Sequence, residues 1–238
     1  MRLTEIKWRW LFQRSYVRGV GNARIIIHEG VNIKNSHIIT YPGTRLLIDK
    51  DAQLRNTKIC LMHGSLTIGR NSIICGTKYQ PMIIDINNGD MHIGHHNRLT
   101  CRKVWVRFGG KLTIGDHTNI NSGSEIRCDE RVDIGSYNQI SYNVRIWDTN
   151  THTILPAEER RKITVEKFPC FGYEDKRPKT APVIIGNDCW IGEYSAILKG
   201  SKIDDRCIVG FGTIITGKTV PEDTTAINSN FLRLIPND

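Results

Sequence analysis

The sequence predicts a β-helix, an all-β fold in which short parallel strands wind around a triangular prism. From Ile185 to Pro221 an aliphatic residue or proline recurs at every sixth position, and a Cys, Ser or Thr follows each one by four positions. Gly, Asn and Asp separate these short β-branched segments. An α-helix repeats about every 3.6 residues and a strand alternates at about two, so a period of six indicates short strands joined by regular bends.

Each predicted coil contains three hexapeptides, one for each side of the prism. An aliphatic side chain from every side points inward, and neighbouring coils stack about 4.8 Å apart as parallel strands. The same period returns upstream in residues 114–126 and, after a slip of two residues, in 134–146, with shorter runs before them. We expect one β-helix domain over residues 20–227, followed by a C-terminal tail at 228–238, because each coil of a solenoid packs only on its neighbours.

Two segments depart from the period of six. Residues 1–19 place apolar side chains at helical spacing among basic ones, which predicts a short N-terminal helical cap over the open end of the prism. A peripheral helix on a membrane surface is the second interpretation of this segment. Residues 153–182 form a protruding loop, and a long loop on a regular scaffold favours a functional role.

Composition narrows the classes of partner. The net charge of +9 favours anionic partners such as nucleotide phosphates or acidic glycans. No nucleic-acid partner is expected, because the aromatic residues are not interleaved with basic ones as in known binding modules. The seven cysteines contain no CxxC pair, and no apolar run is long enough for a membrane span or a secretory signal, so we expect a cytoplasmic protein.

The C-terminal repeats carry a family resemblance. In residues 181–221 the steps Ile185-Gly186, Trp190-Ile191-Gly192 and Leu198-Lys199-Gly200 match the hexapeptide-repeat acyltransferases, in particular the sugar O-acetyltransferases related to the maltose, galactoside and xenobiotic acetyltransferases. The resemblance implies a left-handed parallel β-helix, an exception to the usual right-handed crossover. It also implies a homotrimer with acetyl-CoA as co-substrate in the grooves between subunits.

The resemblance implies a catalytic base at His152. The family has a histidine after the last strand before its protruding loop, and His152 also occupies a position where the period calls for a buried aliphatic residue. A neutral imidazole can take the proton of a sugar hydroxyl as that hydroxyl attacks a thioester. Asp148 is the candidate that orients His152, with the closure of a turn as its structural alternative.

The remaining site residues also follow from the resemblance. Asn121, Cys128 and Trp147 are the candidates for acceptor binding, and Cys128 stands where that group has an aspartate. The candidates for cofactor binding are Trp190, Gly192, Phe211, Gly212, Thr216 and Lys218, where an inserted glycine shifts the lysine by one residue.

These observations predict an acetyl-CoA-dependent O-acetyltransferase acting on a sugar of a surface polysaccharide, a lipopolysaccharide or a precursor. The positive charge favours an acidic carbohydrate acceptor, and a lipid-linked acceptor is a further alternative. N-acylation of an amino sugar and a non-catalytic, glycan-binding solenoid stay open. A metal-dependent carbonic anhydrase of the same fold would need three converging histidines. His92, His95, His96 and His117 are enough in number, but loops interrupt the period around the first three, and we assign no metal site.

Overall fold

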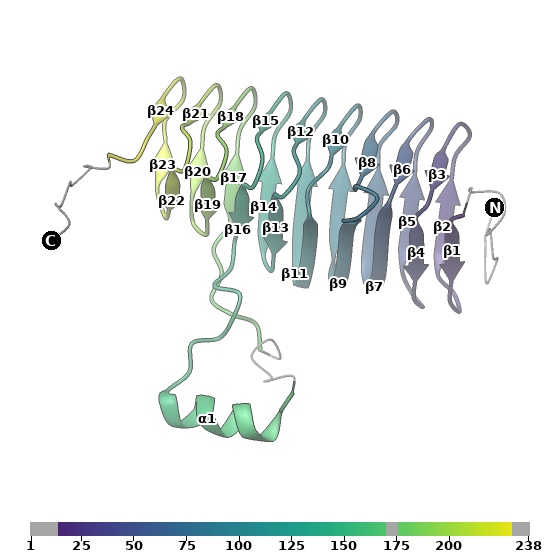
Figure 1. The fold of residues 1–238 in the computed structure, drawn as a ribbon, viewed down its shortest axis with the longest axis horizontal. Coiled ribbons are helices and arrows are strands. Elements are labelled where there is room, and N and C mark those ends of the chain that lie inside the picture. Colours follow the sequence, from purple (N-terminus) through teal and green to yellow (C-terminus); the bar gives the residue numbers. More distant parts are fainter. Residues whose placement is uncertain (1–13, 170–175, 230–238) are drawn as a thin grey trace, which may run out of the picture.

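The protein is a three-sided solenoid of parallel strands with one helical loop hanging from it (Figure 1). The computed structural model describes residues 14–169 and 176–229. Two sides of the prism belong to one continuous sheet, because three long strands run around the corner between them, and the third side is a separate sheet. Each side carries nine strands within the described ranges. This confirms the predicted left-handed parallel β-helix.

The strands are grouped here by the side that they form. Side 1 contains β1 (Tyr16–Gly19), β4 (His37–Thr40), β13 (Glu125–Cys128), β16 (Arg145–Trp147), β19 (Ala196–Leu198) and β22 (Ile214–Thr216). Side 2 contains β2 (Arg24–Ile27), β5 (Arg45–Ile48), β14 (Arg131–Ile134), β17 (Val183–Ile185), β20 (Lys202–Ile203) and β23 (Thr219–Val220). The strands β7 (Thr57–Ile68), β9 (Met82–Ile93) and β11 (Lys103–Ile114) belong to both sides. Side 3 contains β3 (Asn32–Lys34), β6 (Gln53–Arg55), β8 (Ile73–Cys75), β10 (Arg98–Leu99), β12 (Asn119–Ile120), β15 (Gln139–Ile140), β18 (Trp190–Ile191), β21 (Ile208–Val209) and β24 (Thr225–Ala226).

The core is a stack of aliphatic side chains along the axis of the prism. Ile126, Ile146, Ile197 and Ile215 lie in register on successive coils of side 1, and none is more than 6% exposed. Burying such a side chain contributes about 1.5–3 kcal/mol, so the period of six repeats this contribution on every side of every coil. The backbone N–H and C=O groups pair with the coils on either side.

The chain turns at three corners. Corner 1 joins side 3 to side 1, corner 2 joins side 1 to side 2, and corner 3 joins side 2 to side 3. Close stacking at the corners explains Gly192, because a Cβ atom there would come within 2.7 Å of the Val209 carbonyl oxygen in the next coil. Gly192 therefore has a packing role that does not depend on a cofactor.

The N-terminal part of the solenoid begins earlier than we expected. Strand β1 pairs in parallel with β4 from Tyr16 onward, and Val17 is fully buried, although we assigned residues 1–19 to the cap. Pairing with the next coil outweighs the helical spacing of so short a segment. The rest of the predicted cap, residues 1–13, lies outside the described residues. None of the helices in the described ranges is long and apolar enough to cross a bilayer.

The protruding loop leaves the solenoid at corner 2. It connects β16 to β17 and contains α1 (Ala157–Glu166), which hangs away from the prism (Figure 1). No residue of α1 is buried. The base of the loop is closed by backbone hydrogen bonds from Asn150 N to Lys179 O and from Ala181 N to Asp148 O. The loop therefore starts at Asp148, five residues before the predicted bound.

Asp148 holds the corner from which the loop departs. Its carboxylate has no exposed surface; Oδ1 accepts a hydrogen bond from the backbone N–H of Asp129 at 2.8 Å, and Oδ2 accepts those of Glu130 and Arg131 at 2.7 Å. These donors lie on the preceding coil, where the chain turns without a loop. Burial raises the pKa of Asp148 to about 6, although the three N–H donors act in the opposite direction.

Replacing Asp148 by asparagine should remove a pH-dependent part of the stability. Because the folded carboxyl keeps its proton up to a pH near 6 and the unfolded one only to about 4, the contribution of Asp148 is present below pH 4 and falls as the pH rises toward 6. The difference in unfolding free energy between the parent and Asp148→Asn should therefore shrink with rising pH, by about 3 kcal/mol at most.

Urea unfolding at several pH values between 4 and 7 would measure this difference. Asp133→Asn is the control, because that carboxyl lies on the neighbouring strand β14 and is paired with Arg131 near the surface. A difference that grows with pH would mean that the three N–H donors outweigh burial.

Candidate active site

His152 lies at the base of the protruding loop, next to corner 2. Its side chain is exposed, and the two arms of the loop meet around it through the bridge between Thr149 and Thr180. Beyond the bridge, Thr153 donates a hydrogen bond from Oγ1 to the Lys176 carbonyl oxygen at 3.3 Å. The loop therefore presents an imidazole outside the prism, on a support that is tied to the rigid coils.

The carboxylate of Asp148 binds backbone N–H groups of the preceding coil. The three N–H groups of the preceding coil use three of the roughly four acceptor positions that a carboxylate offers. The structure thus supports the structural alternative, in which Asp148 closes the turn. Asp148 therefore anchors the point at which the loop that carries His152 begins.

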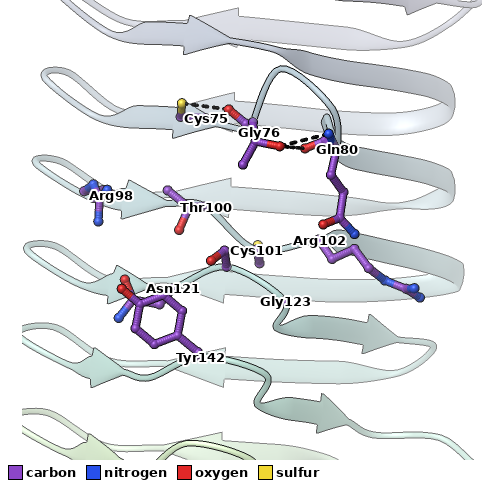
Figure 2. Close-up of a pocket in the computed structure, with 12 residues that line it drawn as sticks. Cys75, Gly76, Gln80, Arg98, Thr100, Cys101, Arg102, Asn121, Gly123 and Tyr142 are labelled. Carbon is purple, nitrogen blue, oxygen red and sulfur yellow. Dashed lines mark hydrogen bonds between the residues drawn. The ribbon is translucent and has the colours of Figure 1, made fainter.

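Asn121 lines a pocket at corner 1. The pocket has a volume of about 210 Å³. Figure 2 shows Asn121 and Tyr142 on one side of it and Gln80 and Arg102 on the other. The other residues that line it are Cys75, Gly76, Thr77, Arg98, Thr100, Cys101, Ser122 and Gly123. Amide, guanidinium and hydroxyl groups around a small hollow are suited to sugar hydroxyls and to anionic groups.

His152 and Asn121 stand at opposite edges of side 1. Asn121 precedes β13 at corner 1, while the loop of His152 follows β16 at corner 2. Strand β13 alone has four residues and spans about 13 Å at roughly 3.3 Å per residue. Within one chain the candidate base and the candidate acceptor pocket are therefore too far apart to act on one hydroxyl.

Trp147 belongs to a column of aromatic and charged side chains on the outer face of side 1. It lies in register with Arg127, which is in register with Trp105, and the Arg127 guanidinium lies 4.4 Å from the centre of the Trp147 ring. Glu125 accepts charge-assisted hydrogen bonds from Arg127 at 2.5 Å and Arg102 at 2.9 Å. Among the described residues, the buried indole Nε1 of Trp147 has no hydrogen-bond partner.

Cys128 does not belong to a surface site. Its side chain has no exposed surface and lies in the core beside Ile126, so its assignment to acceptor binding is wrong. The side chains of β13 alternate between the two faces, and Cys128 is two residues from the inward Ile126. This alternation was visible in the sequence. Burial raises the pKa of the Cys128 thiol well above its usual range.

The candidate cofactor residues lie on the last coils, where the outer surface is apolar. Trp190 is 58% exposed and Phe211 73% exposed, and the ring of Phe211 contacts that of Tyr194 edge-on, with centroids 5.5 Å apart. Thr216 is the exposed last residue of β22, and Gly217 and Lys218 follow on the exposed turn. Sequence reasoning missed the other members of this apolar surface: Tyr194, Ile208, Ile214 and Ile227. Their outward positions in the hexapeptide repeat could have identified them from the sequence.

The histidines considered for a metal do not converge. The rings of His96 and His117 stack at corner 3, with centroids 4.9 Å apart, and Tyr137 continues the stack at 5.0 Å. In the part of the chain that the structure describes, no group of three or more His, Cys, Asp or Glu side chains could hold a metal ion.

The comparisons with known proteins concern the repeats and the fold. Residues 182–217 match the family model described as bacterial transferase hexapeptide (six repeats). The chain is 28% identical over 123 residues to the galactoside O-acetyltransferase of Escherichia coli, covering 52% of this chain and 53% of that one. It is 24% identical over 139 residues to WbbJ of the same species, named as an O-acetyl transferase of lipopolysaccharide biosynthesis, covering 58% of this chain and 67% of that one.

The fold is similar over a greater length. The crystal structure of the polysialic acid O-acetyltransferase OatWY covers 85% of this chain and 80% of its own, with a TM-score of 0.56 and 19% identity. By sequence the chain spans only 32–67% of the length of five curated relatives that it matches. The protein is a left-handed β-helix of hexapeptide repeats that resembles the hexapeptide-repeat sugar O-acetyltransferases.

Proposed function

We propose that the protein is an acetyl-CoA-dependent O-acetyltransferase that acts on a hydroxyl of a sugar, with His152 as general base. The observation that carries this proposal is an exposed imidazole held at the base of a loop tied to a rigid β-helix. The names of the relatives, a galactoside O-acetyltransferase and a lipopolysaccharide O-acetyl transferase, support the reaction. We place the reaction in the cytoplasm, where acetyl-CoA is made.

The reaction needs one base and no acyl-enzyme. The neutral imidazole of His152 accepts the proton of the sugar hydroxyl while the hydroxyl oxygen attacks the thioester carbonyl. The tetrahedral intermediate then expels the CoA sulfur, which receives the same proton from the imidazolium. An ester bond forms, a thioester bond breaks, and the histidine returns to its starting state.

The pocket at corner 1 is our proposed acceptor site. Asn121 and Gln80 offer amide groups, and Arg98 adds a positive charge. Together with the overall charge of +9, this favours a sugar that carries or neighbours an anionic group. A sugar of a surface polysaccharide, a lipopolysaccharide or a precursor fits this chemistry.

The last coils are our proposed cofactor site. The exposed apolar surface around Trp190 and Phe211 suits the pantetheine arm, because large exposed apolar patches mark binding sites. Gly212 and Thr216 offer backbone and hydroxyl groups beside it. Lys218 supplies a charge for the phosphates of the nucleotide.

A homotrimer would assemble the complete site. His152 and Asn121 flank the same side of the prism, so a threefold arrangement with side 1 toward the axis brings the corner 2 edge of one chain against the corner 1 edge of the next. The loop of one copy would then present His152 to the acceptor pocket of its neighbour. Cyclic assemblies of this kind give each subunit the same two contacts.

Two other functions compete with this proposal. N-acylation of an amino sugar would use the same cofactor and base, and a panel of acceptors separates the two. A solenoid that only binds glycans would neither bind acetyl-CoA nor release CoA.

The variant His152→Ala should lose acetyl transfer and keep its fold. General-base catalysis contributes about 10²–10⁴-fold to the rate, so the release of CoA in the presence of acceptor should fall by a factor in that range. The measurement is release of free CoA from acetyl-CoA across neutral, acidic and amino sugars and their oligomers. His92→Ala is the control, because His92 is exposed on side 2 of strand β9. Equal rates for the parent and His152→Ala would remove His152 from the mechanism.

Mixing two inactive variants should restore activity if the site forms between chains. His152→Ala and Asn121→Ala are each expected to be inactive as pure proteins. After the two are unfolded and refolded together, about a quarter of the sites in randomly assembled trimers would pair an intact His152 with an intact Asn121. CoA release at about a quarter of the parent rate is the expected result. No recovery, with mixed trimers demonstrated by affinity tags, would mean that both residues act within one chain or that Asn121 has another role.

A further inference from the structure

A second hollow opens on the edge of the solenoid below the protruding loop. It has a volume of about 570 Å³ and lies where the long strands β7, β9 and β11 turn corner 2. The residues that line it are Met62, His63, Asp85, Asn87, Asn88, Trp105, Arg107 and Phe108. Trp105 shares a column with Trp147, and the other lining residues are separate from the candidate active site. We call this hollow the edge groove.

One wall of the edge groove is a fixed aromatic and cationic surface. The Trp105 ring has Lys103 Nζ at 3.8 Å and Arg107 Cζ at 4.1 Å from its centre. The carboxylate of Asp129 holds the Arg107 guanidinium in place by accepting hydrogen bonds from its Nε at 2.9 Å and from its Nη2 at 2.8 Å. Both partners of this pair are buried, at 5% and 0% exposure. The indole is therefore held in one place, which lowers the entropy cost of binding a ligand against it.

The remaining lining residues offer hydrogen-bonding groups. Asp85 is half-buried on β9, directly in register with Trp105, and burial raises the pKa of its carboxyl. Asn87 and Asn88 expose carboxamides at the corner. Carboxamide and carboxyl groups beside an aromatic ring match the alternating hydroxyl groups and apolar C–H faces of a sugar.

The charges around the edge groove balance. Arg107 is neutralised by Asp129, and Lys103 and Asp85 contribute one charge of each sign on neighbouring strands. A strongly charged ligand would therefore gain little here. The edge groove is suited to an uncharged, hydroxyl-rich ligand, in contrast to the positively charged pocket at corner 1.

The position of the edge groove relates it to the candidate active site. Trp105, Arg127 and Trp147 lie in register on three successive coils, so the nearest wall of the groove, on β11, lies two coils, about 10 Å along the axis, from the point where the loop of His152 departs. Both features are at corner 2, the edge that borders the cleft between neighbouring chains in the proposed trimer. A chain molecule that lies along this edge would reach from one to the other.

We propose that the edge groove binds uncharged sugar units of an oligosaccharide or polysaccharide acceptor, beyond the unit that is acetylated. This proposal rests on the proposed function, because it takes the acetylated unit to be at His152. If the edge groove binds sugar units in this way, the acceptor is a glycan chain. Long acceptors would then bind more tightly than single sugars, because they contact two sites at once.

Binding to a graded glycan array would test the edge groove without using catalysis. The probe is an array of neutral bacterial oligosaccharides that run from single sugars to long oligomers. The parent should bind long oligomers more tightly than single sugars. Trp105→Ala should weaken the binding of long oligomers about tenfold, the scale of a lost aromatic contact, and leave single sugars unchanged. Asn87→Ala should also weaken the binding of long oligomers. Because Asn87 is exposed, misfolding of this variant would not account for the weaker binding.

The matched control is Tyr137→Ala, an exposed aromatic at corner 3, distant from both pockets. Tyr137→Ala should bind like the parent. Binding that is absent, independent of oligomer length, or unchanged in both groove variants would overturn the proposal. Release of CoA from acetyl-CoA, measured in parallel, separates the two ideas. Acetyl transfer without a preference for long acceptors would contradict only the proposal for the edge groove. Binding that depends on the groove, without any acetyl transfer, would contradict the proposed acetyltransferase activity.

Discussion

The stacking of each coil on the next is the constraint on which the rest of the structure depends. Because every strand pairs in parallel with its counterparts in the neighbouring coils, backbone groups are satisfied only if each side keeps the same length and register. Aliphatic residues such as Ile146 and Ile197 then superpose along the axis. An insertion has to leave the prism at a corner, where it interrupts no strand. The protruding loop does so at corner 2.

The same constraint arranges the outward side chains in straight columns. Trp105, Arg127 and Trp147 share one column, so planar rings and guanidinium groups meet at coil spacing and form cation–π contacts. Such contacts contribute about 0.5–2 kcal/mol each. A column therefore combines local rigidity with a continuous chemical surface, and different heights on the prism can serve different parts of one substrate.

The flat sides of the prism also keep the candidate base and the candidate acceptor pocket apart within one chain. A side that is four residues wide keeps the His152 corner and the Asn121 corner apart in one chain. A threefold assembly turns this separation into a cleft between chains, in which rigid coils support groups from both walls. In this proposal the buried carboxylate of Asp148 serves catalysis indirectly, since its three backbone hydrogen bonds fix the start of the loop.

The sequence by itself determined the repeat, and with it most of the fold. The period of six in residues 185–221 requires short strands and corners, and its interruption at His152 marks a loop that the structure contains. The position of Cys128 could also have been read from its two-residue distance to Ile126. The N-terminal bound was less accessible, because Val17 fits both a helix face and a strand until β4 is present to pair with it.

Only the tertiary structure decided which distant segments share a surface. The edge groove takes residues 62–63, 85–88 and 105–108, whose alignment depends on register shifts near His63 and between Arg107 and Gly110. The period does not reveal such shifts, because an extra residue at a corner leaves the inward pattern intact on both sides. The three partners of Asp148 are backbone groups, which leave no mark in the side-chain pattern. The sequence thus determines what each coil buries, and the stacking of the coils decides what the outside of the prism can bind.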